Sequence, residues 1–329
     1  MPTLKTLILL ALSTSLLFAC QDDDDVVPPD TPIVYSAEKY DVIVEEDIVY
    51  AEGLSHDSIN SSSATRLPLK LDVYTPDNDI ENRPVYLFIH GGGFIGGSKQ
   101  QSQILTLANY YTSRGWVFVS IDYRLRDHMG SVPQEWVDYA PFIDNSGLGQ
   151  YFAIYPAQRD AKAALRWLVA NADIYHINTD YITVGGGSAG AITAITLGIS
   201  NPEDFRDEID ISQDPTLATT HLEENYQIQT IIDLWGSGVA LDINEAIYGH
   251  HRFDSDDPPL FIMHGTEDPT VPFSGAEELK ALYDSTGVPI AYYPIEGAGH
   301  GVWNATVNGK RLEKLAFDFI VAEQGLIVE

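Results

Sequence analysis

Hydrophobic and polar positions follow two alternating periods along most of the chain. Short apolar runs, such as 85–90 and 260–264, are typical of strands buried on both faces of a sheet. Between such runs lie stretches with apolar positions at helical spacing, including 157–172 and 312–322. This alternation predicts an α/β domain in which helices cover both faces of a mostly parallel, eight-stranded sheet.

Other segments complete this pattern. In 42–50 and 67–74 apolar and polar residues alternate, which predicts an early antiparallel hairpin. Further strands are expected at 116–122, 181–185, 228–234 and 290–295, and further helices at 101–113, 189–199 and 276–285.

Two long stretches, 126–155 and 201–226, fit neither period. Long inserts in a compact domain are usually lids or binding loops. The first contains Pro, Gly and several aromatic residues, and we expect it to be a small lid insert that forms a wall of the substrate site. The second is strongly acidic, and we expect it to be a solvated surface excursion.

The chain begins with a different kind of pattern. Lys5 precedes an apolar run over 7–18, which is followed by Ala19 and Cys20. A helix of this length extends about 18 Å and is too short to cross a hydrocarbon core of ~30 Å, but it has the size of a signal-peptide core. We therefore expect residues 1–19 to be a signal peptide.

Leu17-Phe18-Ala19-Cys20 resembles the lipobox of bacterial lipoproteins. The resemblance implies that Cys20 is lipidated and anchors the protein in the cell envelope, at the outer membrane, facing either the periplasm or the exterior. The alternative is a plain secreted protein. The four aspartates and the prolines of 20–38 indicate an extended tether, which leaves 39–329 as the folded α/β domain.

The charge balance limits the possible partners. The chain has 18 Lys and Arg against 48 Asp and Glu, a formal net charge of −30. Such a surface repels phosphate backbones, so no nucleic-acid partner is expected. Cys20 is the single cysteine, which excludes an intrachain disulfide.

Ser188 has the sequence context of a catalytic nucleophile. Gly186-Gly187-Ser188-Ala189-Gly190 matches G-x-S-x-G, directly after an expected strand and directly before an expected helix. A sharp turn there lifts the Ser hydroxyl above the sheet, and small residues allow the backbone to bend.

His90-Gly91-Gly92-Gly93-Phe94 ends an earlier buried strand. Backbone N–H groups without side chains can approach a tetrahedral intermediate closely and stabilise its oxyanion. We expect Gly92 to donate, together with Gly91 or Gly93 and the N–H group of Ala189. His90 could be a catalytic base, but a buried His that hydrogen-bonds the loop is the simpler interpretation.

A serine hydroxyl needs a base, and the base needs a partner that orients it. Asp268 lies on an expected turn after the strand 260–264, and His300 lies in a glycine-rich loop after 290–295. The order Ser, Asp, His is the one expected of this arrangement. No metal or cofactor is required.

Other candidates are weaker. Glu267 adjoins Asp268 but points the other way in a regular turn. His250 and His251 adjoin an acidic loop, yet no further residue has the spacing of a metal ligand, so a solvated pair is expected. His264 ends a strand and is expected to be structural.

Taken together, HGGGF, DYRL at 122–125, the helix around 163–172, GGGSAG, HGTEDPTVP and GAGH resemble the bacterial α/β-hydrolase esterases. The resemblance covers most of 65–325 and is greatest to the acetylesterase and carboxylesterase groups near the hormone-sensitive-lipase-like enzymes. Gly186 and Gly187 depart from it, since related groups carry acidic residues at one or other position.

The resemblance implies hydrolysis of carboxylic esters, with short acyl groups such as acetate and, as one option, acetylated or feruloylated plant polysaccharides. A serine peptidase of the same fold is an alternative, although about 60 residues before the first motif cannot build the propeller typical of such peptidases. A binding protein without catalysis is a third hypothesis, and it predicts that Ser188, Asp268 or His300 would be missing.

Overall fold

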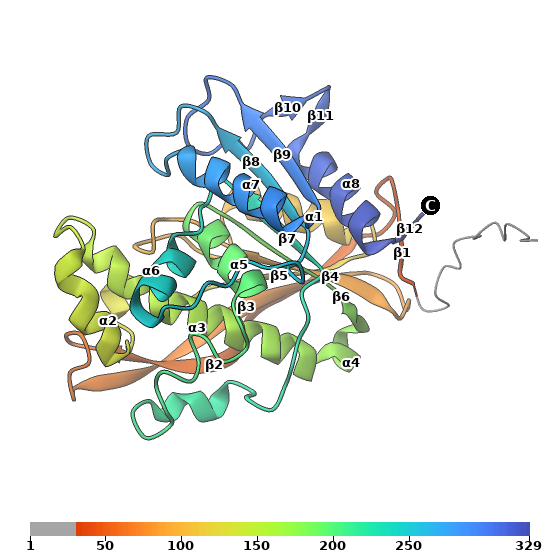
Figure 1. The fold of residues 1–329 in the computed structure, drawn as a ribbon. Helices are drawn as coiled ribbons and strands as arrows, with labels where there is room; N and C mark the ends of the chain where they lie inside the picture. Colours follow the sequence, from red (N-terminus) through yellow and green to blue (C-terminus); the bar gives the residue numbers. More distant parts are fainter. Residues whose placement is uncertain (1–30) are drawn as a thin grey trace, which may run out of the picture.

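The computed structural model describes residues 31–329, and its largest element is an eight-stranded sheet (Figure 1). The strand order is β2-β3-β5-β4-β6-β7-β8-β9. β2 and β3 pair antiparallel with their neighbours, and the other strands run parallel. The strands are β2 (Val42–His56), β3 (Ala64–Pro76), β4 (Arg83–Ile89), β5 (Val117–Ile121), β6 (Ile177–Gly187), β7 (Thr230–Leu234), β8 (Leu260–Gly265) and β9 (Ile290–Ile295). The expected α/β-hydrolase fold is confirmed.

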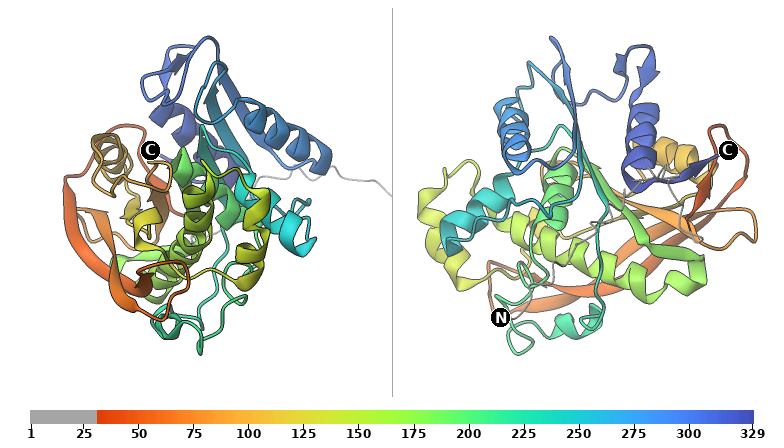
Figure 2. Two further views of the ribbon diagram at one scale, coloured as in Figure 1. Left: turned by 90° about the vertical axis from the view of Figure 1, so that its left-hand side faces the viewer. Right: turned by 45° about the vertical axis from the view of Figure 1, so that its right-hand side comes forward.

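Successive residues of the central strands pack into two cores, one on each face of the sheet. In β4, Val85 and Leu87 enter one core, whereas Tyr86 and Phe88 enter the other. Helices cover both faces, as the views in Figures 1 and 2 show. The first core includes α3 (Leu148–Ala170), α5 (Ala189–Ile199), α6 (Val239–Tyr248) and α7 (Ser274–Thr286), and the second includes α1 (Ser102–Thr112) and α8 (Leu312–Gln324).

Short elements complete the chain. They are the strands β1 (Ile33–Val34), β10 (Thr306–Val307), β11 (Lys310–Arg311) and β12 (Ile327–Val328), the helices α2 (Gln134–Tyr139) and α4 (Ala172–Tyr175), and the 3-10 turns η1 (Arg126–His128), η2 (Ala140–Phe142) and η3 (Pro215–Thr219). No helix within 31–329 is long and apolar enough to cross a membrane.

The insert 126–155 differs from the expected irregular lid. It contains η1, α2 and η2, and α3 begins at Leu148, well before the predicted start at 157. Trp136, Tyr151 and Tyr155 are buried, with neighbouring rings 5.1–5.5 Å apart. Aromatic packing orders this segment, and Pro156 is accommodated inside α3.

The acidic insert 201–226 is only in part the solvated excursion that its composition suggests: acidic residues such as Glu203, Asp207 and Asp210 are exposed, whereas Phe205 and Ile209 are buried. Three buried cations on α3 donate to its backbone carbonyls: Arg159 to Ile209 (3.0 Å), Lys162 to Asn201 (2.5 Å) and Arg166 to Thr220 (2.7 Å). We call Arg159, Lys162 and Arg166 the α3 clamp. The composition did not show the buried part because its burial depends on hydrogen bonds from another part of the chain.

Residues 31–38, the end of the predicted tether, pack on the domain. Ile33 and Val34 of β1 pair in parallel with Ile327 and Val328 of β12, and Val34 is completely buried. These residues therefore belong to the folded domain, which extends the predicted boundary at residue 39. The predicted signal peptide (1–19) and Cys20 lie outside the described residues.

Candidate active site

The turn from β6 to α5 holds Ser188 in a strained conformation. Its φ and ψ are 56° and −122°, which residues with a side chain rarely adopt. A Cβ atom at Gly186 would lie 2.3 Å from the carbonyl of Gly190, and one at Gly190 would lie 2.0 Å from the carbonyl oxygen of Ile89. Close backbone approach therefore requires glycine on both sides of Ser188 and fixes the hydroxyl above the end of β6.

His300 lies between Ser188 and Asp268. The three side chains come from the ends of three parallel strands, since Ser188 follows β6, Asp268 follows β8 and His300 follows β9. The Ser188 hydroxyl donates to Nε2 of His300 over 3.0 Å, and Nδ1–H of His300 donates to Oδ2 of Asp268 over 2.7 Å. The structure thus brings together the three residues that the sequence singled out, in contact distance for proton transfer.

Asp268 is almost completely buried, and every oxygen of its carboxylate has donors. Oδ1 accepts from the N–H groups of Thr270 (2.8 Å) and Val271 (3.0 Å), while Oδ2 accepts from His300. Burial raises the pKa of Asp268, but the hydrogen bonds from His300, Thr270 and Val271 lower that pKa more, so it lies below its ordinary value. The carboxylate is therefore ionised at neutral pH.

Gly91, Gly92 and Gly93 face Ser188 across one cavity. A Cβ atom at Gly91 would lie 2.5 Å from the carbonyl oxygen of Gly187 and 3.2 Å from Cβ of Ser188, which shows how closely the loop approaches the turn. Within 31–329, no protein acceptor takes the backbone N–H groups of Gly91, Gly92, Gly93 or Ala189. These four groups are the ones expected to form the oxyanion hole, and they are available to a ligand.

The cavity above Ser188 has a volume of about 440 Å³, within the range of small-molecule sites. Two indole rings form one wall: Trp235 and Trp303 meet edge to face, with ring centroids 4.8 Å apart. The remaining lining residues outside the triad and the glycine loop include Ile95, Gln101, Gln150, Thr270 and Gly301.

The tryptophan pair gives a physical reason for the departure at Gly187. A Cβ atom at this position would lie 3.4 Å from Trp235 and 3.5 Å from Trp303. An acidic side chain there would be directed at the two rings, so the glycine allows them to close over the turn. At Gly186 the contact with Gly190 excludes any side chain.

His90 is structural, as expected. It is buried, its Nδ1 lies 2.7 Å from the carbonyl oxygen of Gly91, and its ring stacks on Tyr123 at 4.4 Å. Burial lowers the pKa of His90 and favours the neutral ring. His90 therefore holds the glycine loop rather than acting as a base at Ser188.

Among the other weak candidates, His264 contacts the triad of Ser188, Asp268 and His300, whereas Glu267, His250 and His251 are exposed. The side chain of Glu267 is exposed, and its N–H group donates to the carbonyl of Ala298. His250 and His251 are exposed, and His251 contacts Glu245 at 3.0 Å. In the described part of the chain no three His, Cys, Asp or Glu side chains are arranged to hold a metal ion. His264 is buried beside Asp268, at 3.2 Å from Oδ2.

Sequence reasoning missed the tryptophan wall and Gln150. Trp235 directly follows the carboxyl end of β7 and Trp303 follows His300 by three residues. Loops at the carboxyl ends of parallel strands usually line the site, so this position was an available signal. Gln150 carried no comparable signal, because α3 was predicted to begin after it.

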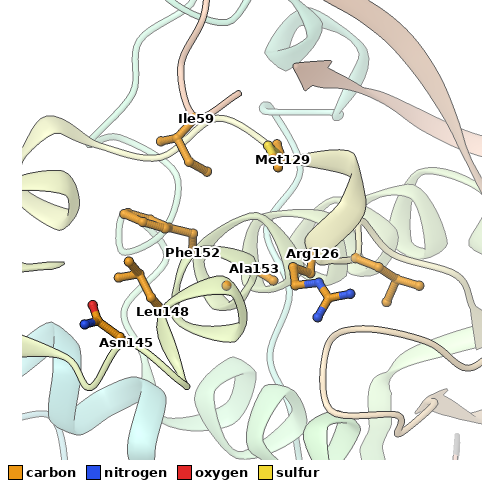
Figure 3. Close-up of a pocket in the computed structure, with 10 residues that line it drawn as sticks. Ile59, Arg126, Met129, Asn145, Leu148, Phe152 and Ala153 are labelled. Carbon is orange, nitrogen blue, oxygen red and sulfur yellow. The ribbon is translucent and has the colours of Figure 1, made fainter. Parts of the chain in front are cut away.

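The insert 126–155 forms a wall of the Ser188 cavity only through Gln150. It also borders a second cavity of about 400 Å³ (Figure 3). Phe152 and Leu148 line one side of this second cavity, with Ile59 and Met129 opposite. The insert thus contributes one polar residue to the Ser188 cavity, whereas its large aromatic side chains Trp136, Tyr151 and Tyr155 are buried in the core.

Comparison with known proteins gives three kinds of match. The BD-FAE family model matches residues 71–143 and 149–247. Esterase LipC of Mycobacterium tuberculosis is 24% identical over 253 residues, which are 70% of this chain and 56% of LipC. Gut esterase 1 of Caenorhabditis briggsae is 36% identical over 132 residues, 40% of this chain and 21% of that protein. The chain thus spans about half, or less, of the length of these relatives.

Among solved structures, the apo form of esterase 2 from Thermogutta terrifontis superposes with a TM-score of 0.57 and 23% identity, covering 87% of this chain and 96% of that one. This similarity supports the fold. The expected kinship with bacterial α/β-hydrolase esterases is confirmed, whereas the lipoprotein form stays a prediction. Since the family model covers just over half of the 329 residues, including Ser188 and the glycine loop, the chain belongs to the BD-FAE family.

Proposed function

We propose that this protein is a serine hydrolase of carboxylic esters that acts through an acyl-enzyme on Ser188. The observation that carries the proposal is the bridge made by His300, which contacts the Ser188 hydroxyl at 3.0 Å and the Asp268 carboxylate at 2.7 Å. The named esterase relatives support the same reaction class. The presence of all three side chains argues against a binding protein that has lost catalysis.

In the first half-reaction, Oγ of Ser188 attacks the ester carbonyl carbon while Nε2 of His300 takes the hydroxyl proton. Asp268 stabilises the imidazolium that forms. The carbonyl oxygen becomes an oxyanion, and it can accept from the N–H groups of the glycine loop and of Ala189. The carbon–oxygen bond to the alcohol then breaks, and His300 returns the proton to the leaving alkoxide.

In the second half-reaction, water attacks the acyl-enzyme with His300 as the general base. The same N–H groups receive the second oxyanion, the bond to Oγ breaks as His300 returns the proton to Oγ of Ser188, and the carboxylic acid leaves. No residue outside the triad and the oxyanion hole has to change its protonation state. Neither half-reaction needs a metal or a cofactor.

The test is the variant Ser188→Ala, assayed with p-nitrophenyl acetate. We expect its kcat to fall by about 10³-fold or more, because the nucleophile is absent and only binding and the oxyanion hole remain. A fluorophosphonate probe should label the unmodified protein at Ser188, detected by peptide mass, and should not label the variant.

The matched control is Ser285→Ala, which removes a hydroxyl from the exposed surface of α7. It should leave both the rate and the labelling unchanged. Substantial ester hydrolysis by Ser188→Ala, or labelling at another residue, would contradict the proposed nucleophile.

Within this function, we propose short acyl groups of the acetyl type, carried on a plant polysaccharide. The size of the cavity supports short acyl groups, since about 440 Å³ must hold the acyl group and part of the alcohol. The half-buried ring of Trp303 supports a sugar as the alcohol, because an aromatic face suits the apolar face of a pyranose. A series of p-nitrophenyl esters from acetate to dodecanoate should show the highest kcat/KM at acetate.

Acetic acid release from acetylated xylan, compared with release from small acetyl esters, tests the alcohol. The polysaccharide proposal fails if Trp303→Ala loses no activity on xylan relative to p-nitrophenyl acetate.

We also propose that lipid on Cys20 attaches the protein to the cell envelope, at the outer membrane. The support is the residue pattern around Cys20 alone. Labelled palmitate should be incorporated into the expressed protein and not into Cys20→Ala, which should move to the soluble fraction. Membrane retention of Cys20→Ala would contradict this attachment.

A further inference from the structure

Two imidazoles share one oxygen of Asp268. Nδ1 of His300 lies 2.7 Å from Oδ2, and Nε2 of His264 lies 3.2 Å from the same atom. His264 is the second-last residue of β8, is completely buried and does not reach the cavity above Ser188. The triad mechanism does not use it, so its contact with the carboxylate needs a separate explanation.

The neighbours of His264 determine where its proton lies. Nε2 is also 3.0 Å from the carbonyl oxygen of Val271, which can only accept, so Nε2 carries the hydrogen and donates it to this oxygen, with Oδ2 of Asp268 beside it at 3.2 Å. Nδ1 is buried and has no hydrogen-bond partner in the described structure. A second proton on Nδ1 would therefore be left without an acceptor, which disfavours the charged ring.

Electrostatics agrees with the neutral ring. Asp268 and His300 are the ionisable groups that act on His264, and the ring of Phe273 packs edge-on against it at 5.7 Å. Burial lowers the pKa of His264 more than the Val271 carbonyl and Asp268 raise it. A neutral His264 does not compete with protonated His300 for the charge of the carboxylate.

The contacts form a closed ring. Val271 donates its N–H group to Oδ1 of Asp268, its carbonyl accepts from Nε2 of His264, and the same Nε2 lies 3.2 Å from Oδ2. Both oxygens of the carboxylate thus have contacts besides the one with His300. Rotation of the carboxylate would break at least one bond of this ring.

We infer that His264 is a positioning residue of the active site: with its N–H group beside Oδ2, it fixes the Asp268 carboxylate in the plane that orients His300. This inference rests on the proposed function, since it assigns a role within the same triad. It makes His264 a contributor to kcat and to the pH profile, beyond any contribution to folding.

The test compares two substitutions of similar size. His264→Gln keeps an N–H group near the position of Nε2, whereas His264→Phe keeps a ring and removes the donor. We expect His264→Phe to lower kcat on p-nitrophenyl acetate by about ten- to a hundredfold with little change in KM, because the missing interaction is one to a charged group. His264→Gln should stay within about threefold of the unmodified protein.

The pH profile of kcat/KM supplies a readout that a folding role would not change. With one donor fewer, Oδ2 attracts protonated His300 more strongly, so the acid limb of the profile should move to higher pH in His264→Phe. It should stay in place in His264→Gln. Rates are normalised to the fraction of protein that a fluorophosphonate labels.

If His264→Phe does not fold, nitrogen NMR on the ¹⁵N-histidine-labelled protein decides the question. We expect the signal lost in His264→Gln to show a neutral ring with hydrogen on Nε2 from pH 5 to 8. A ring that gains a proton along the acid limb overturns the inference, as does a folded His264→Phe with unchanged kcat and profile. When His264→Phe gives one of these contradicting results and Ser188→Ala is inactive, only the inference about His264 fails. When Ser188→Ala is active, the proposed function itself fails.

Discussion

Two of the places where the domain buries charged side chains serve different purposes. Beside the Ser188 cavity, Asp268 is ionised and paired with His300. On the α3 clamp, Lys162 is completely buried and donates to a backbone carbonyl of the acidic insert. Burial lowers the pKa of Lys162 to about 7, although this residue has no part in the triad.

A perturbed pKa therefore does not identify the active site in this molecule. The triad adjoins a cavity of about 440 Å³ and includes a nucleophile that a ligand can reach. The side chains of the α3 clamp are buried and donate instead to the carbonyls of Ile209, Asn201 and Thr220. The two sites differ in whether a ligand can reach them and in what their hydrogen-bond donors contact. These two properties distinguish a catalytic site from a set of buried charges that holds an insert in place.

The largest effect is expected for Asp268→Asn. An Asn amide cannot stabilise the imidazolium and favours the wrong tautomer of His300, so kcat on p-nitrophenyl acetate should fall by about 10³-fold or more. The thermal unfolding midpoint should change little, since the new side chain has the same shape. The exposed Asp254→Asn serves as control. A loss of less than tenfold would place the reaction elsewhere.

A different outcome is expected for Asp160→Asn, which lies on α3 and pairs with Arg124. Both side chains are buried, and Nη2 of Arg124 lies 2.6 Å from Oδ1 of Asp160. Leaving the guanidinium without a counter-charge should lower the free energy of unfolding by about 3–5 kcal/mol, measured by urea titration. The kcat per folded molecule should stay within twofold. The control is Asp127→Asn, which breaks an exposed pair with Arg126 and should leave the free energy of unfolding nearly unchanged.

The smallest effect is expected for Lys162→Met, and it concerns how the free energy of unfolding depends on pH. The pKa of Lys162 is about 7 in the folded state and near 10.5 in the unfolded state. Between these values the unfolded chain binds the extra proton, so this residue makes stability rise with pH from about 7 to about 10. Below pH 7 both states are protonated and the slope vanishes. Urea midpoints at pH 7, 8 and 9 should rise less in Lys162→Met, and equal slopes would contradict the buried, weakly basic lysine.

The parts that sequence could predict are those determined by local chemistry. The turn around Ser188 was predictable because Gly186 and Gly190 are required by backbone contacts a few residues away or on the adjoining strand. The bounds of α5 and β9 are as predicted, because the spacing of apolar residues within each segment indicates its secondary structure. The positions of Asp268 and His300 followed from the ends of consecutive strands.

The parts that sequence could not predict depend on contacts between distant segments. α6 was missed, and the buried part of the acidic insert was not predicted because Arg159, Lys162 and Arg166 lie on α3, far from it in the chain. The same holds for Trp235 and Trp303, whose rings meet only when the ends of β7 and β9 lie near one another. The role of His264 is of this kind, since its spacing from Asp268 gives no sign of the shared oxygen.

The pairing of β1 with β12 has a practical consequence for handling this protein. Thr31, which precedes β1, contacts Tyr181 of β6, whereas Ser188 follows the carboxyl end of the same strand. Seven extended residues separate Tyr181 from Ser188 and span about 20 Å, so β1 lies far from the active site. In Figure 1, β1 and β12 lie side by side at this far edge. A resin or a fusion partner joined at either end of the folded domain would therefore be attached at an edge away from Ser188 and the cavity above it.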